Sequence, residues 1–238
     1  MVFSPRGPEA GPGRDQFPHS SGGAGPALPL VAGLLLALLC AILFGVLAEQ
    51  VQSGAPITRL DGQLAAWFHA HATRGLTLFM LAITWLHSAW GILAMTAVTA
   101  GWLYRERLNA WIVALIVTVP GGMLLNVAFK HLFRRARPHF DDPLLTLATY
   151  SFPSGHTASA TVLYGFLVLL VASHVRERWR VAAAAAGAVL AVCLVALSRM
   201  YLGVHYLSDV LAAASEGGMW LAACGTAFWC WRRRRGQA

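Results

Sequence analysis

A histidine and an aspartate stand four residues apart in the C-terminal part of the chain, at His205 and Asp209. On a helix, this spacing places both side chains on one face, with Cβ atoms about 5–6 Å apart. The carboxylate can then accept a hydrogen bond from one imidazole nitrogen, which fixes the tautomer and leaves the other nitrogen exposed. That arrangement suits a nucleophilic or general-base histidine, although a structural ion pair at a membrane interface would use the same spacing.

The segment Pro153-Ser154-Gly155-His156 is predicted to begin a helix. Proline favours the first turn, and Ser154 is a good N-cap residue. Gly155 lets a ligand approach the backbone closely, and the free N–H groups at a helix start can bind an anion. His156 would then face that anion. An ordinary helix start with an incidental histidine is the alternative interpretation.

Cations cluster between these two segments and before them. Four of them lie within eight residues, and a fifth follows Ser198: Lys130, Arg134, Arg135, Arg137 and Arg199. Arginine recognises phosphate oxygens with a planar fork, and lysine adds a point charge. A basic loop that binds lipid headgroups would also explain some of them, Arg134 above all. Together with the two histidines, they predict a phosphoryl-transfer site in which cations and amides, rather than a metal, stabilise charge.

The composition predicts the elements that must position these residues. Hydrophobic residues make up 57% of the 238 residues and charged residues only 12%, where a soluble domain carries about 25% charged residues. Crossing a bilayer takes about 20 apolar residues, and six segments qualify: Leu28–Ala48, Leu76–Tyr104, Trp111–Phe129, Gly155–Ser173, Val181–Leu197 and Val210–Trp231. We therefore expect an all-α, polytopic membrane helix bundle with six transmembrane helices.

The distribution of positive charge predicts the orientation of this bundle. With six spans, 11 of the 18 Lys and Arg residues fall on the side of both chain ends, which the positive-inside rule makes cytoplasmic. The net charge of +8 is thus explained by topology, and we expect no nucleic-acid partner. The protein is then expected in the cell (inner) membrane. The candidate site lies at the non-cytoplasmic end of the bundle and faces the periplasm or the exterior.

Three further features complete the predicted organisation. Residues 1–27 are expected to be a disordered cytoplasmic tail, 28–231 the six-helix domain and 232–238 a basic cytoplasmic tail. The stretch 61–71 is expected to form a short amphipathic helix at the outer interface, and the span from Leu76 is either one tilted helix or a lead-in helix with a crossing from about Ser88. Glu216 lies inside the last span, where an ionisable group is a functional candidate.

Three motifs in this chain resemble those of the type 2 phosphatidic acid phosphatase family. They are KHLFRRARP at 130–138, PSGH at 153–156 and SRMYLGVHYLSD at 198–209, and they match the family pattern in order and spacing. The resemblance covers roughly residues 28–231. It implies a membrane lipid phosphatase with no cofactor and no metal, whose partners are a lipid substrate and the bilayer.

The resemblance also implies a role for each matching residue. His205 would attack phosphorus and carry a phosphohistidine, Asp209 would orient it, and His156 would protonate the leaving group and then activate water. The phosphate oxygens would be held by Lys130, Arg137, Ser154, Gly155 and Arg199, with supporting roles for Arg135 and Ser198.

The sequence alone leaves several functions possible. Undecaprenyl diphosphate is the first predicted substrate, and phosphatidic acid, phosphatidylglycerophosphate and phosphorylated lipid A are alternatives. A non-enzymatic lipid-phosphate binding or transport protein could use the same scaffold. Vanadium haloperoxidases share the motifs, but they are soluble, so the six apolar segments argue against that class.

Overall fold

The computed structural model describes residues 27–236, and the fold of this part of the chain is all-α. Its eight helices are α1 (Ala27–Gln52), α2 (Ile57–Ala70), α3 (Arg74–Leu86), α4 (Ala89–Arg105), α5 (Asn109–Phe133), α6 (Gly155–His174), α7 (Arg178–Tyr201) and α8 (Leu207–Arg234). The predicted tail of residues 1–26 lies outside the described residues. At the other end α8 continues through Arg234, so the first residues of the predicted basic tail are helical.

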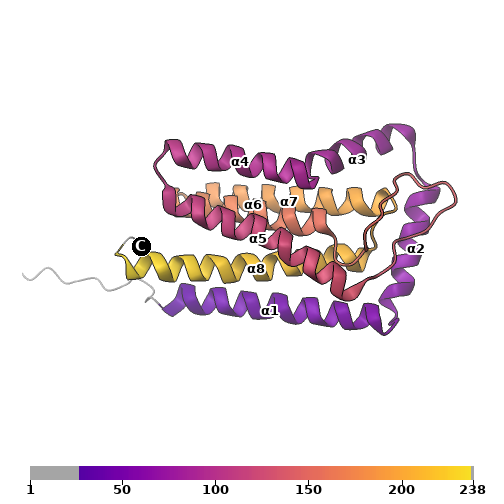
Figure 1. Cartoon of the computed structure of the whole chain (residues 1–238), viewed down its shortest axis with the longest axis horizontal. Helices are drawn as coiled ribbons and strands as arrows, with labels where there is room; N and C mark the ends of the chain where they lie inside the picture. Colours follow the sequence, from indigo (N-terminus) through magenta and orange to yellow (C-terminus); the bar gives the residue numbers. More distant parts are fainter. Residues whose placement is uncertain (1–26, 237–238) are drawn as a thin grey trace, which may run out of the picture.

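The long helices run alongside one another, with α6 inside the bundle and α1 packed along α8 (Figure 1). Helix α6 contacts α5, α7 and α8, and its first turns bury small residues such as Ala158 and Ala160. Small side chains let helices approach closely, which is how membrane helices gain packing energy where the hydrophobic effect between them is weak. Farther along α6, Val162 and Phe166 pack into the main apolar core with Leu115 of α5.

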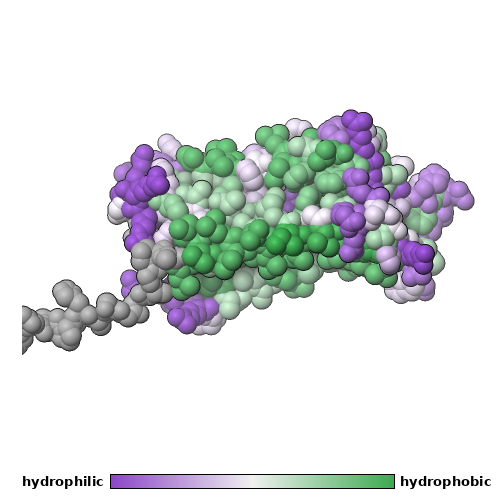
Figure 2. Space-filling model, turned by 90° about the horizontal axis from the view of Figure 1, so that it is seen from below, coloured by the Kyte–Doolittle hydropathy of each residue, from purple (hydrophilic) through white to green (hydrophobic). Residues whose placement is uncertain are grey.

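The outside of the bundle is apolar along its middle and polar at both ends (Figure 2). Leu34, Leu35 and Leu38 of α1 are all more than half exposed, as is Leu124 of α5. Such an apolar surface is favourable against lipid chains, whereas its exposure to water would be unfavourable. Four helices are long and apolar enough to cross a membrane, namely α1, α5, α6 and α7, and the bent pair α3–α4 makes a fifth candidate. The protein is therefore a multi-pass membrane protein.

The count of candidate spans differs from the six predicted from the sequence. The sixth predicted segment lies in α8, which is the longest helix but is not among the candidates. Its sequence mixes Gly, Ser and Glu216 with the apolar residues and ends in three arginines, and this lowers its mean hydropathy. The other predicted spans fall on α1, α3–α4, α5, α6 and α7, in that order.

The second predicted span is two helices, as the lead-in alternative proposed. Helices α3 and α4 meet at a 52° bend. Ser88 is the N-cap of α4 and its side chain accepts a hydrogen bond from the Gly91 amide at 3.2 Å, a local bond that favours a new helix start over continuation. The bend places Thr84 and His87, near the end of α3, in buried positions.

Helix α2 lies across one end of the bundle, at a steep angle to the long helices (Figure 1). It begins four residues before the predicted amphipathic stretch and buries Asp61 and Ala65 on one face. A fully buried aspartate is rare unless it is paired, so Asp61 indicates that α2 contacts a polar partner beneath it.

Candidate active site

Three segments far apart in the sequence meet at the end of the bundle that α2 covers. They are the irregular link 134–154 between α5 and α6, the start of α6, and the turn 202–206 between α7 and α8. The end of α8 lies at the opposite end (Figure 1). Gly203 makes the turn possible, since its φ of +67° is a conformation that other residues adopt only with strain.

The predicted pair of His205 and Asp209 is formed, but its geometry differs from the expectation. His205 precedes α8, which begins at Leu207, so the two side chains are not stacked on one helix face. Asp209 instead sits in the first turn and reaches back: its Oδ2 accepts from the Tyr206 amide at 2.9 Å and lies 3.3 Å from His205 Nδ1. The aspartate therefore caps α8 and orients the histidine with the same carboxylate.

The contacts of His205 determine which ring nitrogen carries its lone pair. Nη1 of Arg137 lies 3.2 Å from Nε2 of His205. A guanidinium can only donate hydrogen bonds, so Nε2 must be the acceptor. The proton is then on Nδ1, directed toward Asp209, and Nε2 is the nitrogen that carries the lone pair.

Burial keeps this imidazole neutral. Burial lowers the pKa of His205 to about 3, and nearby Arg137 and Arg199 lower it further, although Asp209 opposes them. His205 is only 2% exposed. A neutral imidazole is the form that can act as a nucleophile, so the site is poised without a prior deprotonation step.

Arg137 is tied to the backbone around the histidine. Its guanidinium donates to the carbonyls of Thr149 and Val204, both at 2.6 Å, and to that of Tyr150 at 3.0 Å. Burial lowers its pKa, with Asp209 opposing, but a guanidinium remains charged at neutral pH. The link 134–154 and the turn after α7 are thus joined through one cation beside His205.

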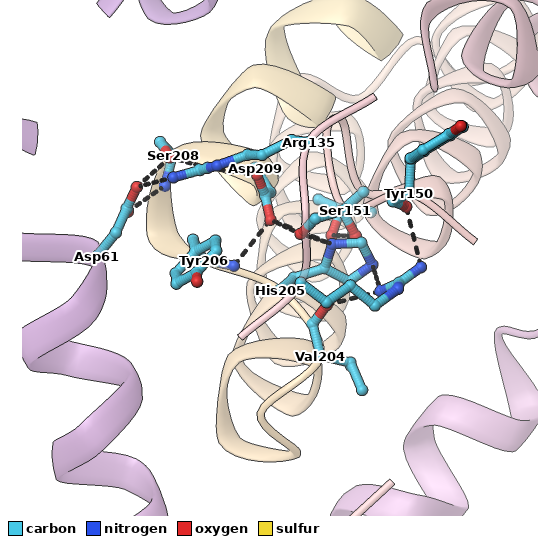
Figure 3. Close-up of polar contacts among 12 residues, drawn as sticks. Asp61, Arg135, Tyr150, Ser151, Val204, His205, Tyr206, Ser208 and Asp209 are labelled. Atoms are coloured by element: carbon cyan, nitrogen blue, oxygen red, sulfur yellow. Dashed lines mark hydrogen bonds and ion pairs between the residues drawn. The ribbon is translucent and has the colours of Figure 1, made fainter. Parts of the chain in front are cut away.

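Asp209 has more partners than the sequence suggested. Arg135 donates to Oδ1 at 2.6 Å, and the Ser151 hydroxyl makes a very short hydrogen bond to Oδ2 (Figure 3). Arg135 was predicted to support the phosphate site; in the structure, its charge is directed at carboxylates. The sequence reasoning missed Ser151, which lies two residues before the second motif and carries no pattern of its own.

The start of α6 has the position predicted for an anion site. Ser154 is the N-cap, although its side chain accepts from the Thr157 hydroxyl rather than from a helix amide. Its own amide donates to the Asp209 carbonyl at 3.2 Å, which joins the starts of α6 and α8. The N–H groups of residues 155–157 have no acceptor within the helix, because they belong to the first turn. A Cβ at Gly155 would lie 3.1 Å from Asn126 Oδ1 and 3.7 Å from Lys130 Cε, so only glycine fits without displacement.

The remaining predicted residues gather around the same point. Lys130 donates to the Tyr150 carbonyl at 2.9 Å and interacts electrostatically with Arg137, Asp209 and Arg199. His156 is half-buried, and among the described residues it has no hydrogen-bond partner. The charges that act on it come from four neighbours, Arg199, His205, His87 and Lys130. His156 therefore lies within electrostatic reach of Lys130, Arg199 and His205.

Arg199 is fully buried, and two of its three guanidinium nitrogens lack a partner in the described structure. Nη1 donates to Thr84 Oγ1 at 2.9 Å, whereas Nε and Nη2 have none. Ser198, predicted as a supporting residue, lies 3.1 Å from the same Thr84 hydroxyl and donates to the Val195 carbonyl. The sequence reasoning missed Thr84, since it comes from a different helix 115 residues away.

Comparison with known proteins identifies the family of this chain. Residues 109–236, more than half of the chain, match the model of the family described as the PAP2 superfamily. The chain belongs to the PAP2 superfamily. It is a PAP2 lipid phosphatase, hence a hydrolase, and the predicted family resemblance is confirmed.

Two curated relatives of this PAP2 protein are each 34% identical to it. Phosphatidylglycerophosphatase B of Bacillus subtilis (strain 168) aligns over 142 residues, which are 58% of this chain and 68% of the relative. Lipid A 1-phosphatase of Rhizobium etli (strain ATCC 51251 / DSM 11541 / JCM 21823 / NBRC 15573 / CFN 42) aligns over 137 residues, 50% of this chain and 54% of the relative.

Two solved structures share the PAP2 fold. The first transmembrane PAP2 type phosphatidylglycerolphosphate phosphatase from Bacillus subtilis superposes with a TM-score of 0.74 at 24% identity, over 79% of this chain and 94% of that one. Aquifex aeolicus LpxE superposes with a TM-score of 0.55 at 25% identity, over 71% and 94%.

The structure gives Glu216 of this PAP2 protein a partner inside the bundle. Its Oε2 accepts from Asn126 Nδ2 at 2.8 Å, while Oε1 has no partner among the described residues. Asn126 lies one turn before Lys130 on α5, and its Oδ1 is the atom closest to a Cβ built at Gly155. Glu216 therefore fixes the amide that packs beneath the start of α6.

Replacing Glu216 with leucine is expected to destabilise the protein, because Asn126 would keep a buried amide with no acceptor. Leaving one such group unsatisfied costs about 1–3 kcal/mol. Thermal unfolding in detergent should show a lower midpoint for Glu216→Leu, and a midpoint close to wild type for Glu216→Gln, whose amide oxygen can still accept. Equal midpoints for Glu216→Leu and the wild type would contradict this role.

Proposed function

We propose that this PAP2 protein hydrolyses a lipid phosphate or diphosphate through a phosphohistidine on His205, with no metal. One observation carries the proposal: Arg137 donates a hydrogen bond to Nε2 of His205, so this nitrogen carries the lone pair, while Nδ1 faces Asp209. A buried, neutral imidazole with one oriented nitrogen is what a nucleophile requires, and a site that only bound lipid phosphate would not need it.

The reaction would proceed in two displacements. Nε2 of His205 attacks phosphorus, the P–O bond to the lipid breaks, and His156, which enters the reaction as the imidazolium, gives its proton to the leaving oxygen. His156 then removes a proton from water, whose oxygen attacks phosphorus and breaks the P–N bond. The products are the dephosphorylated lipid and inorganic phosphate, and both histidines return to their starting states.

The charge on the phosphoryl group would be neutralised by the protein itself. Lys130, Arg137 and Arg199 supply three cations, and the first amides of α6 supply hydrogen bonds, with Ser154 and Gly155 at that helix start. Preorganised cations and amides stabilise such charge strongly in a water-poor site. Asp209 would stabilise the positive charge that develops on His205 as the P–N bond forms.

The comparisons support a glycerophospholipid headgroup as the first substrate to test. The relative named phosphatidylglycerophosphatase B aligns over most of its own length, so we take phosphatidylglycerophosphate as the leading candidate. Lipid A 1-phosphate follows from the second relative. Undecaprenyl diphosphate and phosphatidic acid, predicted from the sequence, stay as predictions.

We further propose that the bundle crosses the membrane six times, with α8 as the sixth span. At 28 residues, α8 is about 42 Å long, and it lies along the apolar α1 (Figure 1). Both ends of the described chain would then be cytoplasmic, beside the arginines that end α8. The site would open on the opposite face, where a lipid can present its headgroup while its tails remain in the bilayer.

The test is phosphate release by the purified protein in detergent micelles, with four substrates compared: phosphatidylglycerophosphate, lipid A 1-phosphate, undecaprenyl diphosphate and phosphatidic acid. We expect phosphate to be released from at least one of them, at an unchanged rate in excess EDTA. A loss of activity in EDTA that Mg²⁺ restores would contradict the metal-free mechanism. A folded protein that binds these lipids but releases no phosphate would instead favour the lipid-binding function.

A further inference from the structure

Asp61 of α2 is joined to the candidate nucleophile through a chain of buried polar contacts (Figure 3). Its Oδ2 accepts from Arg135 Nη2 at 2.8 Å, and Nη1 of the same guanidinium donates to Asp209 Oδ1 at 2.6 Å. Asp61 is 1% exposed and Asp209 is fully buried. Arg135 therefore bridges two buried carboxylates, one on α2 and one beside His205.

Several hydrogen bonds fix the position of the Asp61 carboxylate. Asp61 Oδ1 accepts from the Ser208 amide at 2.9 Å, and Oδ2 also accepts from the Ser208 hydroxyl. That hydroxyl in turn accepts from Arg135 at 2.7 Å, and the guanidinium lies over the Tyr206 ring at 4.3 Å. Burial lowers the pKa of Arg135, but the two carboxylates outweigh it and raise the pKa overall, so this cation stays charged.

We propose that Asp61 is a positioning residue for the phosphatase reaction, acting on His205 through Arg135 and Asp209. The proposal rests on the function proposed above and adds to it a residue from outside the three motifs. Because Arg135 occupies Asp209 Oδ1, the other oxygen, Oδ2, is left to face His205. Asp61 thereby holds Arg135 in place, and Arg135 fixes the Asp209 carboxylate that orients His205.

The charge balance gives Asp61 a second effect. Asp61, Arg135 and Asp209 together carry one net negative charge beside His205. When His205 takes the phosphoryl group, its ring becomes positive and the cluster becomes neutral. Without the charge of Asp61, Arg135 would cancel Asp209 before the reaction, and these residues would offer no net negative charge to stabilise the developing positive charge on His205. Fixed charges near a reacting group in a buried site have large effects on rate.

A purely structural role for Asp61 is the competing explanation, since it also holds α2 against the start of α8. The two roles predict different kinetics. A structural role would act without Arg135, whereas a positioning role needs it. Residues that act through one another give non-additive effects in a double-mutant cycle.

The test uses Asp61→Asn, which keeps an oxygen for the Ser208 amide but removes the charge that balances Arg135. We expect kcat for the best lipid phosphate to fall at least tenfold, with KM within about twofold of wild type, because only the carboxylate behind the nucleophile changes. In an Arg135→Met background, the same substitution should change kcat less than twofold. Asp142→Asn is the matched control, since this carboxylate is 89% exposed and pairs with His69.

The outcomes separate this inference from the proposed function. If Asp61→Asn had the kcat of the wild type, or lowered kcat by the same factor in both backgrounds, the positioning role would be wrong. Phosphate release by the wild type would still support the proposed phosphatase function. A wild-type protein that releases no phosphate and forms no phosphoenzyme would overturn both. A lower thermal midpoint alone, with kcat preserved, would assign Asp61 to structure only.

Discussion

Replacing His205 with alanine is expected to lower phosphate release by a factor of about 10⁴ or more, the scale at which loss of a nucleophile acts in hydrolases. Within residues 27–236, no other group in the site is placed to replace it: His156 has no carboxylate partner there that would fix its tautomer, and Lys130 is held by the Tyr150 carbonyl. The variant should also form no acid-labile phosphoenzyme when rapidly quenched with ³²P-labelled substrate. Phosphate release and quenched labelling together measure the effect.

His174→Ala is the matched control for this experiment. His174 is an exposed histidine at the far end of α6, so its loss should leave turnover and labelling intact. Both variants should elute as the wild type does in size-exclusion chromatography. Turnover by His205→Ala within tenfold of wild type, or full phosphoenzyme labelling without His205, would remove the nucleophile assignment and with it the two-step mechanism.

The fold could be predicted largely because the bilayer imposes simple rules on helices. Long apolar runs located α1, α5, α6 and α7 to within a few residues. The break between α3 and α4 was left open, because hydropathy is continuous across it and only the Ser88 cap decides. Residues 210–231 of α8 were predicted as a span because Glu216 alone interrupts their run without charges, but the mixed composition of the helix leaves it outside the clear candidates.

The site was predictable where motifs are local and not where contacts join distant segments. The positions of His205, Asp209 and Ser154 follow from their own segments. Asp61 and Thr84 could not be found in this way, because each meets its arginine across more than 70 residues with no pattern around it. Even for His205 and Asp209, the spacing gave the right pair for a partly wrong reason, since the first of them lies outside α8.

Arg199 has the geometry of a phosphate-binding residue. Its Nε and Nη2 form the edge of the guanidinium that can make two parallel hydrogen bonds to a phosphate. Both are buried without a partner in the described structure, while Nη1 is held by Thr84. A buried, half-satisfied cation is costly for a folded protein, and the arrangement is explained if phosphate completes it.

Replacing Arg199 with methionine should therefore lower activity without lowering stability. We expect kcat/KM to fall about 10³-fold, because a cation that contacts the transferring phosphoryl group is lost. In phosphate-free buffer, thermal unfolding in detergent should occur at the same temperature as in the wild type or at a higher one, since an unpaired buried charge is replaced by an apolar chain of similar length. Inorganic phosphate should raise the midpoint of the wild type but not that of the variant.

Arg134→Met provides the comparison for this prediction. Arg134 is an exposed arginine on the same face whose side chain donates only to the His131 carbonyl among the described residues. Its loss should leave kcat/KM within a few fold and the phosphate-induced shift unchanged. If Arg199→Met unfolded at a much lower temperature and phosphate still stabilised it as it does the wild type, the empty edge would be a structural feature of the bundle rather than a phosphate contact. Arg199→Lys sharpens the distinction, because lysine restores the charge without the fork. Partial stability with little recovered turnover would then show that two parallel hydrogen bonds, and not positive charge alone, are what this position contributes.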